Sequence, residues 1–146
     1  MSEPPSIFTL EAVNALVPRL RAIMQAQMER RTHIERSLDR LAELLGRAPE
    51  DIQIDARDPA SVRDLKRDLA ARIAAYRSGW REVEKLGAVL KDARMGLVDF
   101  QGRVDGKLVW LCWKYGEETV THYHGLDEGF SARKPIEAAM RLRHLN

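Results

Sequence analysis

Two histidines stand two positions apart in the stretch THYHGLDEGF. If His122 and His124 lie on one β-strand, their imidazoles project from the same face, because successive side chains of a strand alternate between faces. Two imidazoles on one face can begin a divalent-metal site, which needs at least a third ligand. The carboxylates available nearby are Asp127, Glu128 and Asp99. The spacing predicts a metal site at His122, His124 and Asp127.

A structural role for the same stretch stays open. His124 can pack at a sheet edge and donate a hydrogen bond to Asp127 or to a backbone carbonyl. The glycines on either side of Asp127 favour a turn, after which Phe130 should anchor the chain in the core. In both versions we expect His124 and Asp127 to touch or to share a ligand. Arg133 would clamp an anionic ligand or pair with Asp127 or Asp99.

The segment VWLCW, at positions 109–113, is apolar on both faces of a strand. Trp110 and Cys112 should face one way and Trp113 the other. The helices would cover one face of this strand, and the C-terminal loop, a partner chain or a ligand would cover the other face. The tryptophans are then core residues or the walls of a ligand site. Such a site would be lined by Trp110, Trp113, His124, Asp127, Phe130 and Arg133.

Cys112 is the only cysteine, so no intrachain disulfide can form. This fits a reducing, cytoplasmic setting. Cys112 could be a nucleophile with His124 as its base, but a mid-strand cysteine among tryptophans is typical of an inert core residue. The motifs H-E-x-x-H, C-x-x-C and G-x-S-x-G do not occur. We therefore expect a protein without catalytic residues.

The composition is that of one globular domain. The chain has 146 residues, 45% of them hydrophobic and 32% charged. Basic and acidic residues number 24 and 22, a balance that argues against nucleic acid as a partner. No apolar run approaches the ~20 residues of a membrane span, and we expect neither a signal peptide nor membrane contact.

The elements that must position these residues begin with two long helices. Seven-residue apolar repeats predict helices over 10–45, with Thr9 as N-cap, and over 59–94. Pro18 should kink the first helix or mark its real start. Equal lengths and the short connection 46–58 favour a coiled-coil-like antiparallel hairpin.

The period then changes to that of strands. We predict a three-stranded antiparallel sheet at the open end of the hairpin, with strands at 96–100, 107–113 and 118–124. Pro135 should begin a short helix. The fold class is therefore α+β. We predict a single domain over 1–146. Its parts are the hairpin at 10–94, the β-meander and C-terminal loop at 95–136, and a tail at 137–146.

The apolar stripe follows both helices along their whole length, whereas the sheet can cover only one end. We therefore expect a homodimer that covers the other end. The residues expected in its interface are Ile34, Leu38, Leu41, Leu65 and Leu69.

Four segments carry a family resemblance: FTLEAVNALVPRL, LKDARMGLVDF, LCWKYGEETV and YHGLDEGFSARKPI. In them the chain resembles a bacterial family known as domain of unknown function 2203, over about the whole chain to Ile136. The resemblance supports the helical hairpin and implies no activity. It implies motif positions at His124, Asp127, Gly129, Phe130, Arg133 and Pro135.

From these observations we expect a non-catalytic cytoplasmic interaction or assembly module. It would be oligomeric through its helices and carry a small-ligand site at the sheet and the loop 121–135. The alternative is a small divalent-metal-binding protein or metal-dependent enzyme that uses His122, His124 and Asp127. Metal analysis of the purified protein distinguishes the two.

Overall fold

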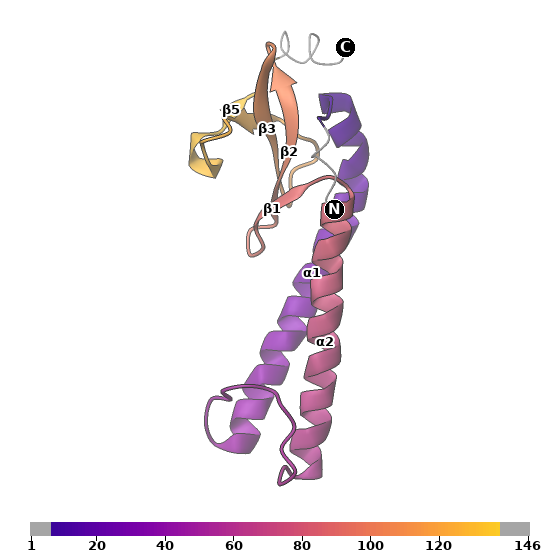
Figure 1. Cartoon of the computed structure of the whole chain (residues 1–146), viewed down its shortest axis with the longest axis vertical. Coiled ribbons are helices and arrows are strands. Elements are labelled where there is room, and N and C mark those ends of the chain that lie inside the picture. The colour runs from indigo at the N-terminus through magenta and orange to yellow at the C-terminus, as the bar shows by residue number, and fades with distance from the viewer. Residues whose placement is uncertain (1–6, 138–146) are drawn as a thin grey trace. The chain divides into compact units, whose positions relative to one another are not determined.

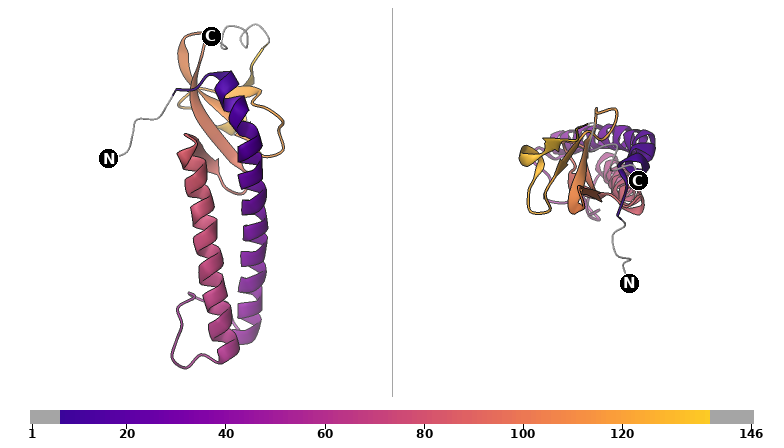
Figure 2. Two further views of the ribbon diagram at one scale, coloured as in Figure 1. Left: turned by 90° about the vertical axis from the view of Figure 1, so that its right-hand side faces the viewer. Right: turned by 90° about the horizontal axis from the view of Figure 1, so that it is seen from above.

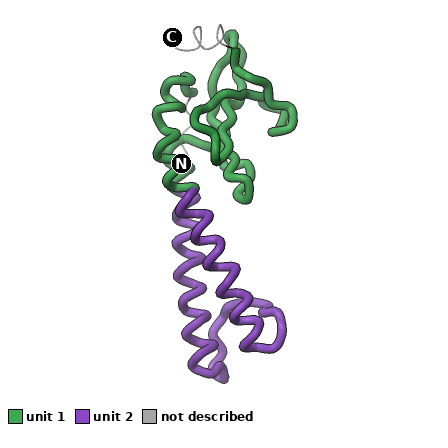
Figure 3. Tube along the Cα trace, turned by 180° about the vertical axis from the view of Figure 1, so that it is seen from behind, with its two compact units in different colours: residues 1–24, 82–146 green, residues 25–81 purple. Residues whose placement is uncertain are grey.

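The computed structural model describes residues 7–137, which form two helices followed by a five-stranded antiparallel sheet (Figures 1 and 2). The protein is therefore of the α+β class, as predicted. No helix in the described range is long and apolar enough to cross a membrane. Contacts along the chain divide it into two compact units, residues 1–24 with 82–146 and residues 25–81 (Figure 3).

Helix α1 spans Leu10–Leu45, the range that the apolar repeat predicts. Thr9 caps it, because the threonine hydroxyl accepts the amide proton of Ala12 at 3.1 Å. Gly46 follows the helix with a φ of 72°, a left-handed conformation that glycine adopts without a Cβ clash. Pro18 lies inside the helix and so does not mark its start.

Helix α2 spans Ala60–Lys85 and is shorter than predicted. The chain leaves the helix at Gly87, whose φ is 94°, and strand β1 follows at Val89–Asp92. The predicted helix end near Arg94 is therefore wrong. Leu90 falls at the next position of the seven-residue repeat, but it lies in β1 and pairs with the second strand of the sheet.

The sheet has five strands in sequence order, not three. After β1 they are Leu97–Val104 (β2), Lys107–Lys114 (β3), His122–His124 (β4) and Lys134–Pro135 (β5). The strand predicted at 118–124 keeps only its last 3 residues. β5 takes the place of the helix start predicted at Pro135, and its 2 residues are too few to show a period. The rest of that predicted helix, beyond residue 137, lies outside the described residues.

Cross-strand register assigns the residues to two faces. One face carries the fully buried Val98, Phe100, Leu111 and Trp113. The first turns of α1 lie beside the sheet (Figure 2), and Asn14 Oδ1 accepts the amide proton of Val120 at 2.7 Å. The opposite face carries Asp99 and Cys112.

Residues 25–81 have a core of their own, built from both helices and the loop between them. Its members are Leu41, Val62 and Leu69, with Ile34, Leu38, Leu45, Ile52 and Leu65 packed against them. Leu41 and Leu69, expected in a dimer interface, are 0% exposed within the single chain. Gln27 interrupts the apolar stripe of α1 and is also buried, where its amide donates to the Tyr76 carbonyl at 2.7 Å.

Candidate metal centre

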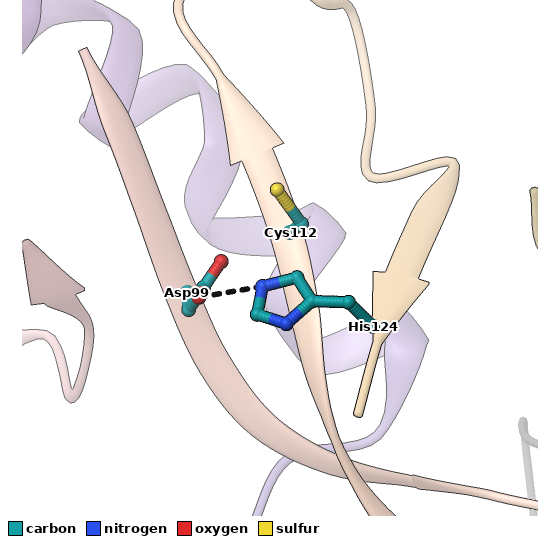
Figure 4. A group of neighbouring side chains, drawn as sticks. All are labelled: Asp99, Cys112 and His124. Carbon is teal, nitrogen blue, oxygen red and sulfur yellow. Dashed lines mark hydrogen bonds and ion pairs between the residues drawn. The ribbon is translucent and has the colours of Figure 1, made fainter. Parts of the chain in front are cut away.

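Three side chains from neighbouring strands meet on one face of the sheet (Figure 4). Asp99 comes from β2, Cys112 from β3 and His124 from β4. Asp99 and Cys112 are direct cross-strand partners, and His124 is the partner of Trp110, which shares a face with Cys112. Alternation along each strand therefore turns all three side chains to the same side.

The three side chains form a compact, buried group. One potential ligand atom from each lies within 4.8 Å of the other two. Asp99 and Cys112 are 0% exposed and His124 is 2% exposed. His124 Nε2 lies 2.8 Å from Asp99 Oδ2, whereas Asp99 Oδ1 is buried without a hydrogen-bond partner among the described residues. A buried carboxylate oxygen without a geometric hydrogen-bond partner is rare, although the neighbouring Cys112 thiol also acts on Asp99 and partly offsets the rise that burial causes in the pKa of its carboxyl.

The two bonds of His124 define where its protons lie. A backbone carbonyl can only accept, so Nδ1 donates to the Gly125 carbonyl at 3.0 Å. Nε2 faces Asp99, and one proton is held between them, either on the carboxyl or on the imidazole. A metal ion bound to Nε2 and the carboxylate would replace that proton.

Burial governs the ionisation of the other two groups. It raises the pKa of the Asp99 carboxyl, although the neighbouring His124 acts in the opposite direction. Burial, together with Asp99, raises the pKa of the Cys112 thiol to about 12. The thiol of the metal-free protein is therefore protonated at neutral pH. A bound cation would reverse this, because it stabilises both the thiolate and the carboxylate.

The geometry does not favour Cys112 as a nucleophile. A Cys–His pair needs one imidazole nitrogen on the sulfur, and both nitrogens of His124 bond to other groups, Asp99 and Gly125. The raised pKa of the Cys112 thiol also argues against a nucleophilic role, since the thiolate is the reactive form.

Arg133 approaches the group from the loop between β4 and β5. Its Nη1 lies 3.9 Å from Cys112 Sγ, and its guanidinium donates to both carboxylate oxygens of Glu117 at 3.0 and 3.3 Å. The ring of Phe130 stacks against the guanidinium, 4.4 Å from its carbon. Arg133 therefore pairs with Glu117 rather than with Asp127 or Asp99. Phe130 is half-buried, and the prediction that it anchors the loop in the core is not met.

Of the predicted metal ligands, only His124 belongs to the group. His122 lies on the same strand, and its Nδ1 is 2.8 Å from Thr121 Oγ1. Asp127 is exposed in the turn after β4, while both ring nitrogens of His124 have other partners. The predicted His124–Asp127 contact is therefore wrong, and Asp99, 25 positions earlier in the chain, takes that place.

The two tryptophans face opposite sides of the sheet, as the alternation predicts. Trp113 is fully buried, and its Nε1 donates to the Glu117 carbonyl at 3.0 Å. Trp110 is half-buried on the face of the Asp–Cys–His group, with the Lys91 ammonium 4.4 Å from its ring centroid. The two rings therefore cannot form the walls of one flat-ligand site.

Glu117 is the residue that sequence reasoning misses, whereas Asp99 appears there only as an alternative third ligand behind Asp127. The signal for Asp99 is an acidic residue inside the apolar segment GLVDF, because a carboxylate in a covered strand needs a partner. Nothing local signals Glu117, since its pairing with Arg133 depends on where the loop after β4 returns to the sheet.

The fold and the site define a class: a small α+β protein with a buried Asp–Cys–His group across three neighbouring antiparallel strands. A family model described as uncharacterized conserved protein (DUF2203) matches residues 6–136. The chain belongs to this family, as its motifs predict. Searches among curated proteins and among solved structures gave no match.

Proposed function

We propose that the protein binds one divalent metal ion through Asp99, Cys112 and His124. The observation that carries the proposal is the group itself: three buried side chains of ligand type, with one atom of each within 4.8 Å of the others. The buried, unpartnered Asp99 Oδ1 supports it, because a buried oxygen without a partner is costly and a cation would satisfy it.

The donor set favours zinc or a similar borderline metal. Thiolate and imidazole select such ions over calcium or magnesium, which prefer oxygen ligands. The bond from His124 Nδ1 to the Gly125 carbonyl leaves Nε2 as the ligand atom, an arrangement common among metal-binding histidines. Zinc bonds are roughly 2.0–2.3 Å long, so we expect the three side chains to move closer together on binding.

The burial of the group favours a binding role over turnover of a large substrate. All three side chains are at most 2% exposed. Three protein ligands would still leave a fourth position for water or a small ligand, as in catalytic zinc sites. The alternative of a metal-dependent enzyme is thereby restricted to small substrates.

We also propose that α1 and α2 form a coiled-coil-like antiparallel hairpin that acts as an assembly arm. The shared core of residues 25–81 and the Gln27–Tyr76 bond support the hairpin. Leu44 and Ile54 remain 39% and 46% exposed and are candidate contacts for a second chain. The free thiol of Cys112 fits a cytoplasmic location.

Elemental analysis tests the metal proposal. Protein stripped with a chelator, reloaded with zinc and desalted should retain one zinc ion per chain. Asp99→Asn, Cys112→Ser and His124→Gln should each abolish retention, whereas Asp127→Asn, at an exposed carboxylate of the adjacent turn, should leave it unchanged. Circular dichroism checks that each variant is folded. Wild-type protein without stoichiometric zinc, or equal loss in Asp127→Asn, would contradict the proposal.

A further inference from the structure

The loop of residues 125–133, here called the lid, touches the Asp–Cys–His group at both of its ends. At the first end the Gly125 carbonyl accepts the Nδ1 proton of His124 at 3.0 Å. At the last end Arg133 Nη1 lies 3.9 Å from Cys112 Sγ. The side chain of Arg133 is 17% exposed, whereas the Cys112 beside it is 0% exposed.

The lid has few backbone bonds to the sheet. The backbone bonds found inside it are local: Glu128 to Gly125, Ala132 to Gly129 and Arg133 to Phe130. The chain joins the sheet only after the lid, in the 2-residue strand β5. Side-chain contacts must therefore hold the lid down.

The strongest of these contacts is the pair of Arg133 with Glu117. It is bidentate, at 3.0 and 3.3 Å, and Glu117 is only 21% exposed. Glu117 is itself fixed, because its Oε1 also accepts the amide proton of Lys114 at 2.7 Å. A charge-assisted bidentate pair of this kind is stronger and more directional than a single exposed ion pair.

We propose that Arg133 and Glu117 form a clamp that gates the metal site, so that the ion enters and leaves when the lid opens. This inference rests on the proposed function for the identity of the ion. A metal-bound Cys112 is a thiolate, which accepts the Arg133 proton more strongly than a thiol does. Bound metal should therefore also hold the lid closed.

The single cysteine makes lid opening measurable without metal. Cys112 is free and buried, so under this proposal its reaction with a thiol reagent in metal-free protein should require the lid to open. Glu117→Gln keeps the acceptor for Lys114 and removes the charge, so it should speed labelling about fivefold or more. Asp68→Asn, which breaks the Arg72–Asp68 pair on α2, is the matched control and should label at the wild-type rate.

A second control separates lid opening from general destabilisation. Val17→Ala lowers stability at a buried position of α1 and should leave labelling unchanged while labelling is faster than global unfolding. Equal labelling rates in wild type and Glu117→Gln would overturn the gate. So would equal acceleration in Val17→Ala.

Metal release gives the second readout. Zinc-loaded Glu117→Gln should release its ion to excess chelator about fivefold faster than wild type, and should still bind one ion per chain. Equal release rates would overturn the gate and leave the metal site intact. If wild type binds no zinc, the proposed function and the gate fail together, and the labelling rates then report only whether the clamp holds the lid.

Discussion

Asp99 is the residue of the site whose burial and hydrogen bonding have the clearest energetic consequences. Its carboxylate is fully buried, with one oxygen on His124 and the other without a partner among the described residues. Burial raises the pKa of this carboxyl, so the charged form has an energetic cost in the metal-free protein. A residue that lowers the stability of the metal-free protein, and that would hold the ion in the proposed metal-bound protein, is typical of a functional site.

Replacement of Asp99 by asparagine should separate metal binding from stability. Asparagine can donate a hydrogen bond to His124 Nε2 and carries no buried charge, so the free energy of unfolding of the metal-free variant should lie within about 1 kcal/mol of wild type. Zinc binding should nevertheless be lost. Urea denaturation and zinc titration measure the two properties. A variant that binds zinc as tightly as wild type would remove Asp99 from the site.

Trp113 and Trp110 should differ in their contribution to stability. Trp113 is fully buried and hydrogen-bonded through its ring nitrogen, so Trp113→Ala should cost ~3–5 kcal/mol of unfolding free energy. Trp110 is half-buried, and Trp110→Ala should cost less than half as much. Chemical denaturation of the two variants gives the comparison. The reverse order would show that the faces are assigned wrongly.

For single residues, the sequence predicts the strand face on which a side chain lies better than it predicts the side chain that it contacts. The alternation of 109–113 puts Trp110 and Cys112 on one face, and THYH marks His124. The contact of His124 with Asp99 spans 25 positions and depends on the register of three strands, which no local pattern reveals. The nearby Asp127 is therefore the carboxylate that sequence reasoning selects.

Among the elements, the loop between the helices contains a largely buried ion pair. Lys66 Nζ donates to Asp58 Oδ2 and to the Gln53 carbonyl, each at 2.8 Å, and the Lys66 side chain is 8% exposed. The hydrogen bond from Lys66 lowers the pKa of the Asp58 carboxyl. The loop thus closes over the end of the helices through a charge pair and through Ile52.

This pair gives a defined pH dependence. The pKa of Asp58 is lower in the folded than in the unfolded protein, so its contribution to stability is complete above pH ~4 and is lost as pH falls through the folded pKa. Asp58→Asn should therefore be less stable than wild type at neutral pH, and the difference should vanish in strong acid. Urea denaturation across pH measures this. A difference that grows on acidification would contradict the assignment.

The helices were predictable to different degrees. The repeat from Leu10 to Leu45 gives α1 completely, because the Thr9 cap and Gly46 mark its ends. The repeat in the second helix predicts an end of α2 that is too late, because Leu90 keeps the seven-residue period after the chain has turned at Gly87 into β1. Strand β5 carries no signal, because two residues that include a proline show no alternation.

For the whole molecule, assembly remains a prediction. We expect light scattering to give twice the chain mass of 16.7 kDa. Leu41 and Leu69 are already covered within one chain, so the interface should depend on the exposed Leu44 and Ile54. Leu44→Glu with Ile54→Glu should then yield monomers. A monomeric wild type at micromolar concentration would contradict this assembly.

The central claim is that one ion binds to Asp99, Cys112 and His124, and cobalt titration tests it most directly. A cobalt–thiolate bond gives an intense charge-transfer absorption that oxygen and nitrogen ligands do not, and this chain has a single thiol. We predict that the band saturates at one cobalt per chain in wild type and in Asp127→Asn. It should be absent in Cys112→Ser. A wild-type protein that shows no such band, or a band that persists in Cys112→Ser, would contradict the claim.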